Sequence, residues 1–134
     1  MTAKKAKRFD KCYPPTAVWT YIDESPGKGK GVFARADIEA GRLIEVCPLI
    51  VLSQTDAAIC SETTLTSYMF KAVVGKGGVI AGGHGSFYNH SDTPNCEFKI
   101  TKQNLYITVI KDIKEEEELT FNYGWSSDFT GDFK

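Results

Sequence analysis

No stretch of this sequence has the residue spacing of an amphipathic helix three turns long, and this absence most constrains its fold. Apolar residues occur instead in short runs separated by glycine, proline and polar residues. Six glycines fall within residues 75–85, where the chain must turn tightly or let another backbone segment come close. No repeat or heptad pattern is present either. The sequence therefore predicts a mainly β protein of short strands with little helix.

Several short runs rich in β-branched and aromatic residues predict individual strands. Strands are expected at residues 18–22, 32–34, 65–74 and 119–123, with a hairpin of residues 97–100 and 105–110. In the strand 65–74, alternation would place Tyr68 and Phe70 on one face. Pro48 interrupts the apolar run 43–52, which predicts two short strands joined at a kink rather than one strand. Residues 53–62 form the only plausible helical turn in the first half of the chain, and residues 23–31 form a turn-rich connection.

Length and charge limit the possible functions. The chain has 134 residues, which suits one domain with one core, and its 16 basic and 17 acidic residues nearly balance. Residues 1–11 carry five basic residues and one acidic residue, which leaves eleven basic and sixteen acidic residues, a net charge of −5, in residues 12–134. An acidic body with a basic arm argues against a general nucleic-acid binder. The run of four carboxylates at residues 115–118 is interpreted as solvated surface. No signal peptide or membrane span is visible, so a cytoplasmic location is expected by default, with a nuclear or host-directed one left open.

The cysteines give no sign of a metal or redox site. The chain has four, at positions 12, 47, 60 and 96, and none forms a C-x-x-C pair. The spacing of His84, His90 and Cys96 matches no common metal site. We therefore predict reduced, mostly buried thiols and no bound metal.

Three segments are richer in chemically special residues than a structural core requires. In residues 27–33 (GKGKGVF), glycine at every second position lets a ligand approach the backbone, although an ordinary mobile turn has the same composition. The polar side chains of residues 86–96 (SFYNHSDTPNC) either cap a loop or, at His90, supply a base. Residues 118–125 (ELTFNYGW) alternate Phe121, Tyr123 and Trp125 on one face of a strand, which core packing would also explain.

Together and in this order, the three segments resemble the signatures of the SET-domain family of protein lysine methyltransferases. The resemblance covers residues 19–125, most of the chain. It implies a SET-domain (β-clip) fold of short strands in several small sheets, with a C-terminal pseudoknot in which the Asn-His-Ser segment and the last strand thread each other. It also implies methyl transfer from S-adenosylmethionine to the ε-amine of a lysine in a protein, with S-adenosylhomocysteine as product.

The resemblance assigns roles to particular residues. Those expected to bind the cofactor are Lys28, Gly29, Lys30, Asn89, His90, Tyr123 and Trp125. Most of these contacts would come from main-chain groups, so His90 becomes a cofactor binder rather than a base. Trp125 would lie near the cofactor or at the mouth of the substrate channel.

The substrate lysine would enter from the opposite face through an aromatic channel. The residues expected to line it are Tyr68, Phe98, Phe121 and Tyr123, of which Tyr68 and Tyr123 are assigned to catalysis. The Tyr123 hydroxyl would orient the methyl group and the amine for in-line transfer, which is catalysis by positioning. A tyrosine hydroxyl in such a channel limits the room for further methyl groups. Because the two positions that vary between Tyr and Phe in the family, Phe98 and Phe121, are both Phe, we predict di- or trimethylation.

Departures from the family pattern predict a minimal, stand-alone SET protein of the viral or bacterial kind. Asp92 replaces the cysteine that follows Asn-His-Ser in zinc-dependent relatives, and Ser86 replaces a larger residue, usually arginine. Neither a cysteine-rich pre-SET region nor a zinc-binding post-SET region is visible. We expect a basic arm at residues 1–15 and one SET domain at residues 16–134. Either Phe129 or Phe133, or a second subunit, would cover the site, so both a monomer and a homodimer are compatible with the sequence.

Other functions remain open at this point. A catalytically inactive SET module would bind peptides or partners, but the retained Tyr123 and the intact Asn89-His90 pair argue against it. A small β-barrel that binds nucleic acid would need a basic face with interleaved aromatic residues, which an acidic body does not offer. The sequence does not identify the substrate: histones, histone-like proteins and ribosomal proteins are all candidates. The basic arm is a candidate for automethylation, and a small-molecule amine is a further alternative acceptor.

Overall fold

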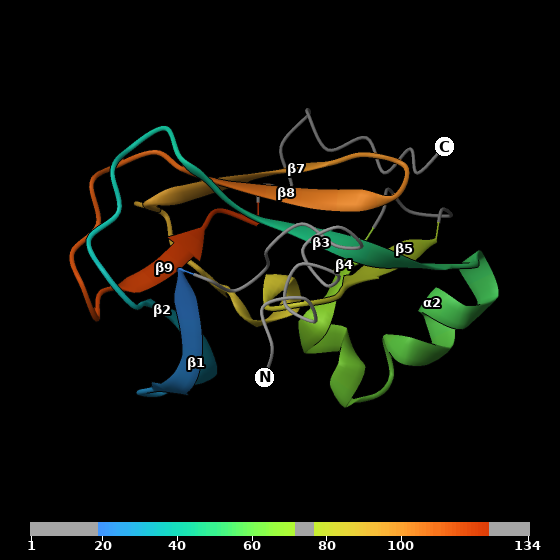
Figure 1. Cartoon of the computed structure of the whole chain (residues 1–134). Helices are drawn as coiled ribbons and strands as arrows, with labels where there is room; N and C mark the ends of the chain where they lie inside the picture. The colour runs from blue at the N-terminus through green and yellow to red at the C-terminus, as the bar shows by residue number, and fades with distance from the viewer. Residues whose placement is uncertain (1–18, 72–76, 124–134) are drawn as a thin grey trace, which may run out of the picture.

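The computed structural model describes residues 19–71 and 77–123 of the chain (Figure 1). In order, its elements are β1 (Thr20–Ser25), β2 (Gly29–Ala34), β3 (Leu43–Leu52), α2 (Gln54–Cys60), η1 (Thr64–Tyr68), β4 (Met69–Lys71), β5 (Gly78–Ala81), η2 (Gly85–Phe87), β6 (Asn89–His90), β7 (Cys96–Ile100), β8 (Asn104–Val109) and β9 (Glu118–Phe121). The two η elements are short 3-10 helices. The mainly β class is confirmed. Within this part of the chain no helix is long and apolar enough to cross a membrane.

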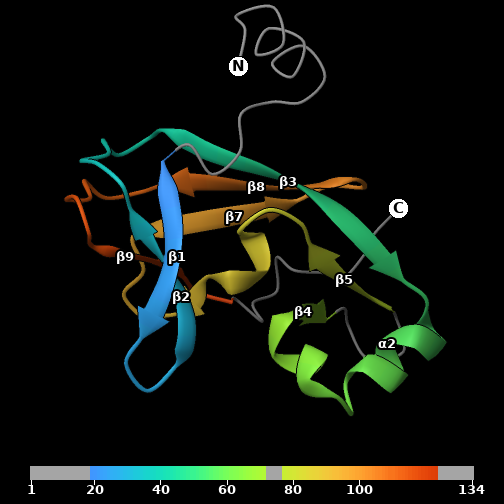
Figure 2. The same cartoon turned by 60° about the horizontal axis from the view of Figure 1, so that its bottom comes forward.

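The strands form two small sheets. The four-stranded sheet has the order β1-β2-β9-β6, and the five-stranded sheet has the order β4-β5-β3-β8-β7. Figures 1 and 2 both place β1 and β2 at one end of the molecule and α2 at the other, with β3 running between the two ends. The predicted hairpin of residues 97–100 and 105–110 is confirmed as β7 and β8, which pair from Cys96–Val109 to Ile100–Leu105.

Strand β3 runs through Pro48 without a break, so the prediction of two short strands at residues 43–52 is wrong. Its neighbour changes at the proline, because Leu43–Pro48 pair with β8 and Leu49–Leu52 pair with β5. Proline has no backbone N–H and disrupts a strand that needs a neighbour on both sides. Each half of β3 has its neighbour on one side only, so the proline is tolerated and one strand serves two ladders.

Two other predicted boundaries also differ from the structure. Residues 65–71 are not all extended, because Thr64–Tyr68 is a 3-10 helix whose start is capped by the Thr63 hydroxyl, and only Met69–Lys71 form a strand. Tyr68 therefore precedes the strand that contains Phe70, and alternation does not place the two on one face. The turn-rich connection is shorter than residues 23–31, since β1 and β2 pair as far as Ser25 and Gly29. The helical turn expected at residues 53–62 is confirmed as α2.

The last strand brings the three signature segments together. On one edge β9 pairs in parallel with β6, through Asn89–Thr120 and His90–Phe121. On its other edge β9 pairs antiparallel with β2, through Val32–Leu119 and Phe33–Glu118. The glycine-rich hairpin, the Asn-His-Ser segment and the final segment therefore meet in one sheet. Because β9 ends at Phe121, Tyr123 follows the strand rather than belonging to it, and Trp125 lies outside the described residues.

A single cluster of buried apolar side chains joins the two sheets, and it includes the completely buried Phe121. Cys47 and Cys96 belong to this core and are free thiols, as predicted, and Cys60 is a free thiol that is half-buried. Burial, with a smaller contribution from Glu117, raises the pKa of Cys96 to about 12, so this thiol stays protonated at neutral pH. Cys12 lies outside the described residues.

Candidate active site

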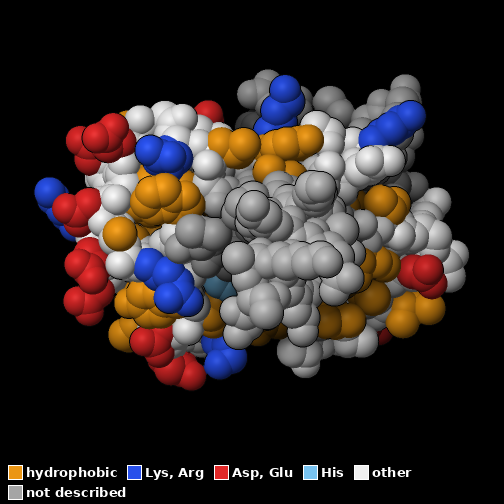
Figure 3. All heavy atoms as spheres, in the orientation of Figure 1, with side chains coloured by type: hydrophobic (Ala, Val, Ile, Leu, Met, Phe, Trp, Pro, Cys, Tyr) orange, Lys and Arg blue, Asp and Glu red, His pale blue; other side chains and the backbone are white. Residues whose placement is uncertain are grey.

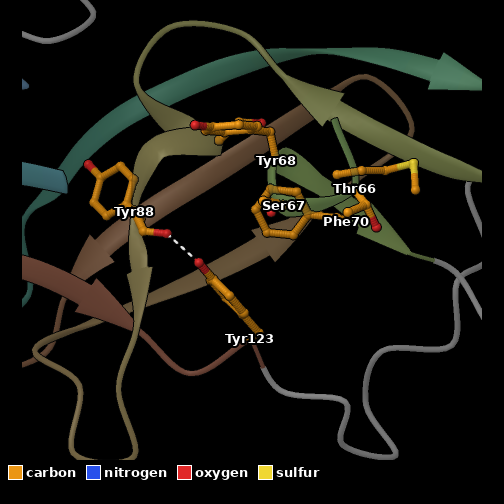
Figure 4. Close-up of a pocket in the computed structure, with 8 residues that line it drawn as sticks. Thr66, Ser67, Tyr68, Phe70, Tyr88 and Tyr123 are labelled. Atoms are coloured by element: carbon orange, nitrogen blue, oxygen red, sulfur yellow. Dashed lines mark hydrogen bonds between the residues drawn. The ribbon is translucent and has the colours of Figure 1, made fainter. Parts of the chain in front are cut away.

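A pocket of about 160 Å³ opens between the η1–β4 segment and the start of the Asn-His-Ser segment. Its lining residues are Thr66, Ser67, Tyr68, Met69, Phe70, Ser86, Tyr88 and Tyr123. Figure 4 shows the rings of Tyr68 and Phe70 on one side and Tyr123 facing the backbone of Tyr88 on the other. Aromatic rings from three separate parts of the chain thus surround one small cavity.

Tyr123 presents its hydroxyl inside this pocket. The hydroxyl donates a hydrogen bond to the backbone carbonyl oxygen of Tyr88 at 2.7 Å, the dashed line in Figure 4. Burial raises the pKa of the Tyr123 phenol, and the negative charge of Glu118 raises it further. The phenol is therefore protonated at neutral pH and acts as a fixed hydrogen-bond donor.

The other two predicted channel residues lie in an aromatic cluster beside the pocket. The ring centroids of Phe98 and Phe121 are 4.8 Å apart, and Tyr88 stacks on Phe121 at 5.0 Å with an interplanar angle of 15°. Phe70 joins this cluster through its contact with Phe98 at 5.4 Å. Of the four predicted channel residues, Tyr68 and Tyr123 line the pocket, whereas Phe121 is completely buried behind it.

Sequence reasoning missed Phe70, Tyr88 and Ser86 as lining residues. Phe70 was expected to share a face with Tyr68, but as part of a strand rather than as a pocket wall. Tyr88 directly precedes Asn89, and its backbone carbonyl, not its side chain, accepts the Tyr123 hydrogen bond. No residue-type pattern in the sequence predicts a contact made by a backbone oxygen, so this contact had no sequence signal.

Hydrogen bonds at both ring nitrogens hold His90 in one tautomer. The backbone N–H of Tyr123 donates to Nδ1 at 3.1 Å, so Nδ1 must be unprotonated. The hydrogen of the neutral ring then lies on Nε2, which donates to the Asp92 carboxylate at 2.9 Å. Both nitrogens are engaged in fixing the Tyr123 backbone and the following loop, which leaves His90 poorly suited to act as a base.

Glu118 corrects our interpretation of the carboxylate run 115–118 as solvated surface. Glu115, Glu116 and Glu117 are exposed, but Glu118 is half-buried. Its carboxylate accepts hydrogen bonds from the Ser25 hydroxyl at 3.0 Å and from Asn89 Nδ2 at 2.8 Å. The last residue of the run is therefore an internal link between the β1–β2 hairpin, β6 and β9.

The tip of the β1–β2 hairpin is exposed and lies beside Asn89. Lys28, Gly29 and Lys30 are exposed, and the Asn89 side-chain amide donates to the Lys30 carbonyl oxygen at 3.1 Å. Gly29 has a φ of 77°, a left-handed conformation that glycine adopts without strain, and a Cβ built there would meet nothing within 4 Å. The open space beside Gly29, next to a polar amide, leaves room for a ligand to approach this turn.

A second, fully internal carboxylate lies behind the pocket. Glu45 is 2% exposed and accepts hydrogen bonds from the His84 backbone N–H at 2.7 Å and from the Tyr88 hydroxyl at 3.3 Å. Burial raises the pKa of the Tyr88 phenol and of the Cys47 thiol, and Glu45 adds to both shifts. Both groups remain neutral, so the core holds a carboxylate surrounded by donors.

The described residues contain no group of three or more His, Cys, Asp or Glu side chains placed to hold a metal ion. His84 Nδ1 lies 2.9 Å from the Thr20 hydroxyl, and His90 is paired with Asp92, so the two histidines belong to separate hydrogen-bond networks.

Comparison with known proteins identifies the family. Residues 29–124 match the family model described as SET domain. The chain belongs to the SET-domain family. This confirms the resemblance to the SET-domain lysine methyltransferases that the three segments indicated, and the β fold agrees with it.

Two histone-lysine N-methyltransferases and a solved structure are similar to this chain. A Schizosaccharomyces pombe histone-lysine N-methyltransferase, H3 lysine-37 specific, is 36% identical over 106 residues, which cover 77% of this chain and 71% of that protein. An Emericella nidulans histone-lysine N-methyltransferase, H3 lysine-4 specific, is 30% identical over 115 residues, 76% of this chain but 9% of that protein. The Chaetomium thermophilum Polycomb Repressive Complex 2 bound to S-adenosylmethionine matches with a TM-score of 0.65 at 29% identity, over 78% of this chain and 15% of that one. The chain thus spans most of the first relative and a small part of the other two.

Proposed function

We propose that this protein is an S-adenosylmethionine-dependent protein-lysine N-methyltransferase that acts on a histone or another basic protein. The observation that carries the proposal is the aromatic pocket in which Tyr123 presents a fixed hydroxyl, in a chain of the SET-domain family. Histone methylation by the S. pombe and E. nidulans relatives supports the choice of substrate class. Such a substrate implies a nuclear role.

The surface charge suits a basic substrate. Residues 12–134 carry a net charge of −5. Figure 3 shows acidic side chains along the edge formed by the loops at residues 35–42 and 110–117, interspersed with lysine and arginine. Exposed Asp37, Glu39, Asp112, Glu115 and Glu116 belong to these loops. An acidic surface raises the encounter rate with lysine-rich segments through long-range attraction.

The lysine must lose a proton before it can attack. A free lysine has a pKa of about 10.4, so the neutral amine costs about 4 to 5 kcal/mol at pH 7. S-adenosylmethionine supplies an electrophilic methyl group when bound. The aromatic residues Tyr68, Phe70, Tyr88 and Tyr123 line the pocket, and a lysine bound among them would lose much of its hydration, which disfavours the ammonium form and lowers the lysine pKa. No dedicated base is needed, in keeping with the engagement of both His90 nitrogens.

Tyr123 would orient the reacting groups. Its hydroxyl hydrogen is directed at the Tyr88 carbonyl, so its oxygen lone pairs face away from Tyr88 and can accept a hydrogen bond from the lysine amine. We assign cofactor binding to the backbone of Lys28, Gly29 and Lys30 together with Asn89. Tyr68 would form the facing wall of the lysine channel. Trp125, Phe129 and Phe133, for which we proposed roles at the cofactor or as a cover, lie outside the described residues.

The function is tested by incubating the protein with radiolabelled S-adenosylmethionine and core histones. We expect label on a histone lysine, located by mass spectrometry, and binding of S-adenosylmethionine by isothermal titration calorimetry. If label is transferred to proteins of a cell extract but not to histones, the protein is a methyltransferase with a substrate other than histones. Cofactor binding with no transfer to either would favour the alternative, a catalytically inactive SET module that binds peptides.

The degree of methylation is a separate prediction. We expect the wild-type protein to form di- and trimethyllysine, because neither Phe98 nor Phe121 carries a hydroxyl that would hold a water beside the amine. Phe98→Tyr is expected to shift the product toward monomethyllysine, and it is the better variant because Phe98 is half-buried whereas Phe121 is completely buried. Mass spectrometry over a long time course measures the three products. A wild-type reaction that stops at monomethyllysine would contradict the prediction.

A further inference from the structure

The Glu118 carboxylate links the β1–β2 hairpin to the Asn-His-Ser segment. Glu118 is the first residue of β9 and pairs with Phe33 of β2. Its Oε1 accepts from the Ser25 hydroxyl at 3.0 Å, and its Oε2 accepts from Asn89 Nδ2 at 2.8 Å. Through one side chain, the final segment is therefore tied to the hairpin on one side and to the Asn-His-Ser segment on the other.

The Glu118 carboxylate also decides which way the Asn89 amide points. A carboxylate only accepts hydrogen bonds, so the NH₂ group of Asn89, and not its oxygen, must face Glu118. The same NH₂ group donates to the Lys30 carbonyl oxygen at 3.1 Å. Both N–H bonds are thus used, and the Asn89 Oδ1 accepts no hydrogen bond from residues 19–71 or 77–123. That oxygen is left as an oriented acceptor beside the hairpin.

Gly31 gives independent evidence that this contact is closely packed. A Cβ built at Gly31 would overlap Glu118 Oε2 and would come within 2.9 Å of Asn89 Nδ2. Gly31 is buried, unlike the exposed Gly29, and a side chain there would displace the Glu118–Asn89 pair. Two glycines of one motif therefore have different physical roles.

We propose that Glu118 is a positioning residue for the cofactor site. It fixes the orientation of Asn89 and holds the β1–β2 hairpin at the distance at which the Lys28, Gly29 and Lys30 backbone can bind the cofactor. The inference rests on the proposed function, because it takes S-adenosylmethionine to bind between these segments. Charge-assisted hydrogen bonds are shorter and stronger than neutral ones, which suits a carboxylate to this task.

The test measures the dissociation constant of S-adenosylmethionine by calorimetry in the full-length chain. Glu118→Ala removes both hydrogen bonds and is expected to weaken binding about tenfold, which corresponds to about 1.4 kcal/mol. Glu118→Gln keeps the shape and one acceptor oxygen, and about a threefold loss is expected from neutral hydrogen bonds. Glu118→Gln also tests the proposal if the Glu118→Ala variant does not fold. Glu115→Ala is the matched control, because Glu115 belongs to the same run and is exposed.

A double-mutant cycle separates positioning from a general loss of structure. Ser25→Ala should weaken cofactor binding about threefold in the wild-type background and not at all in the Glu118→Ala background, because its effect runs through that carboxylate. KM for the cofactor should rise in the Glu118 variants while KM for the lysine substrate stays constant. Binding within twofold of wild type in both Glu118 variants, or equal losses from Ser25→Ala in both backgrounds, overturns the inference. Failure of the wild-type protein itself to bind S-adenosylmethionine overturns the proposed function, and this inference with it.

Discussion

Replacing Tyr123 by phenylalanine is expected to lower kcat for methyl transfer about a hundredfold, the effect of removing one positioned hydrogen-bonding group from an active site. The hydroxyl is fixed by its 2.7 Å hydrogen bond to the Tyr88 carbonyl, and the ring packs 5.8 Å from Phe121. Phenylalanine keeps the ring contacts and removes only the oxygen. The dissociation constant of S-adenosylmethionine should therefore change by less than about twofold.

The control for this variant is Tyr106→Phe. Tyr106 lies on β8, pairs with Val46 of β3, and does not line the pocket. Its loss of a hydroxyl should leave kcat unchanged. Steady-state kinetics and calorimetry on both variants decide the matter. If Tyr123→Phe keeps more than a third of the wild-type kcat, Tyr123 does not orient the reacting groups.

Replacing Glu45 by alanine is expected to lower the free energy of unfolding by about 3 kcal/mol, because buried donors lose a charged partner. The lost acceptor serves the His84 backbone N–H and the Tyr88 hydroxyl, and neither donor can reach water easily where Glu45 is 2% exposed. Tyr88 also stacks on Phe121, so the loss reaches the pocket wall. Urea denaturation followed by circular dichroism measures the change.

Two comparisons sharpen this experiment. Glu39→Ala removes an exposed carboxylate from a loop and should change the stability by less than about 0.5 kcal/mol. Glu45→Gln keeps one acceptor oxygen and should fall between the two alanine variants. Equal stabilities of Glu45→Ala and Glu39→Ala would mean that the buried carboxylate contributes nothing to the fold.

The sequence predicted the family and most strands because the signature segments are local patterns of residue type. The glycine-rich turn, the Asn-His-Ser segment and the β7–β8 hairpin each follow from a few adjacent residues. Where prediction failed, the deciding contacts lie far apart in the chain. Pro48 does not break β3 because two different strands flank its two halves, and no local pattern contains that information.

The candidate site shows the same division. Motif position predicts roles for Tyr123 and Asn89, whereas a run of four carboxylates predicts solvated surface at Glu118. Only pairing of β9 with β2 and β6 places Glu118 beside Ser25 and Asn89, which are 93 and 29 residues away in the chain. The 3-10 helix that contains Tyr68 differs from these cases, because it begins at a local cap, the Thr63 hydroxyl, which the strand prediction for residues 65–74 overlooked.

The parallel ladder between β6 and β9 has a consequence for synthesis and folding. It consists of two residue pairs, and one partner strand is made about thirty residues after the other. A nascent chain in which Glu118–Phe121 have not yet left the ribosome can form the β3–β8–β7 ladder. It still lacks the Glu118 carboxylate beside Asn89 and the Tyr123 side chain of the pocket. Enzyme activity should therefore appear in a single late step of folding. In a time-resolved refolding experiment, the ability to transfer a methyl group would report the docking of this last strand.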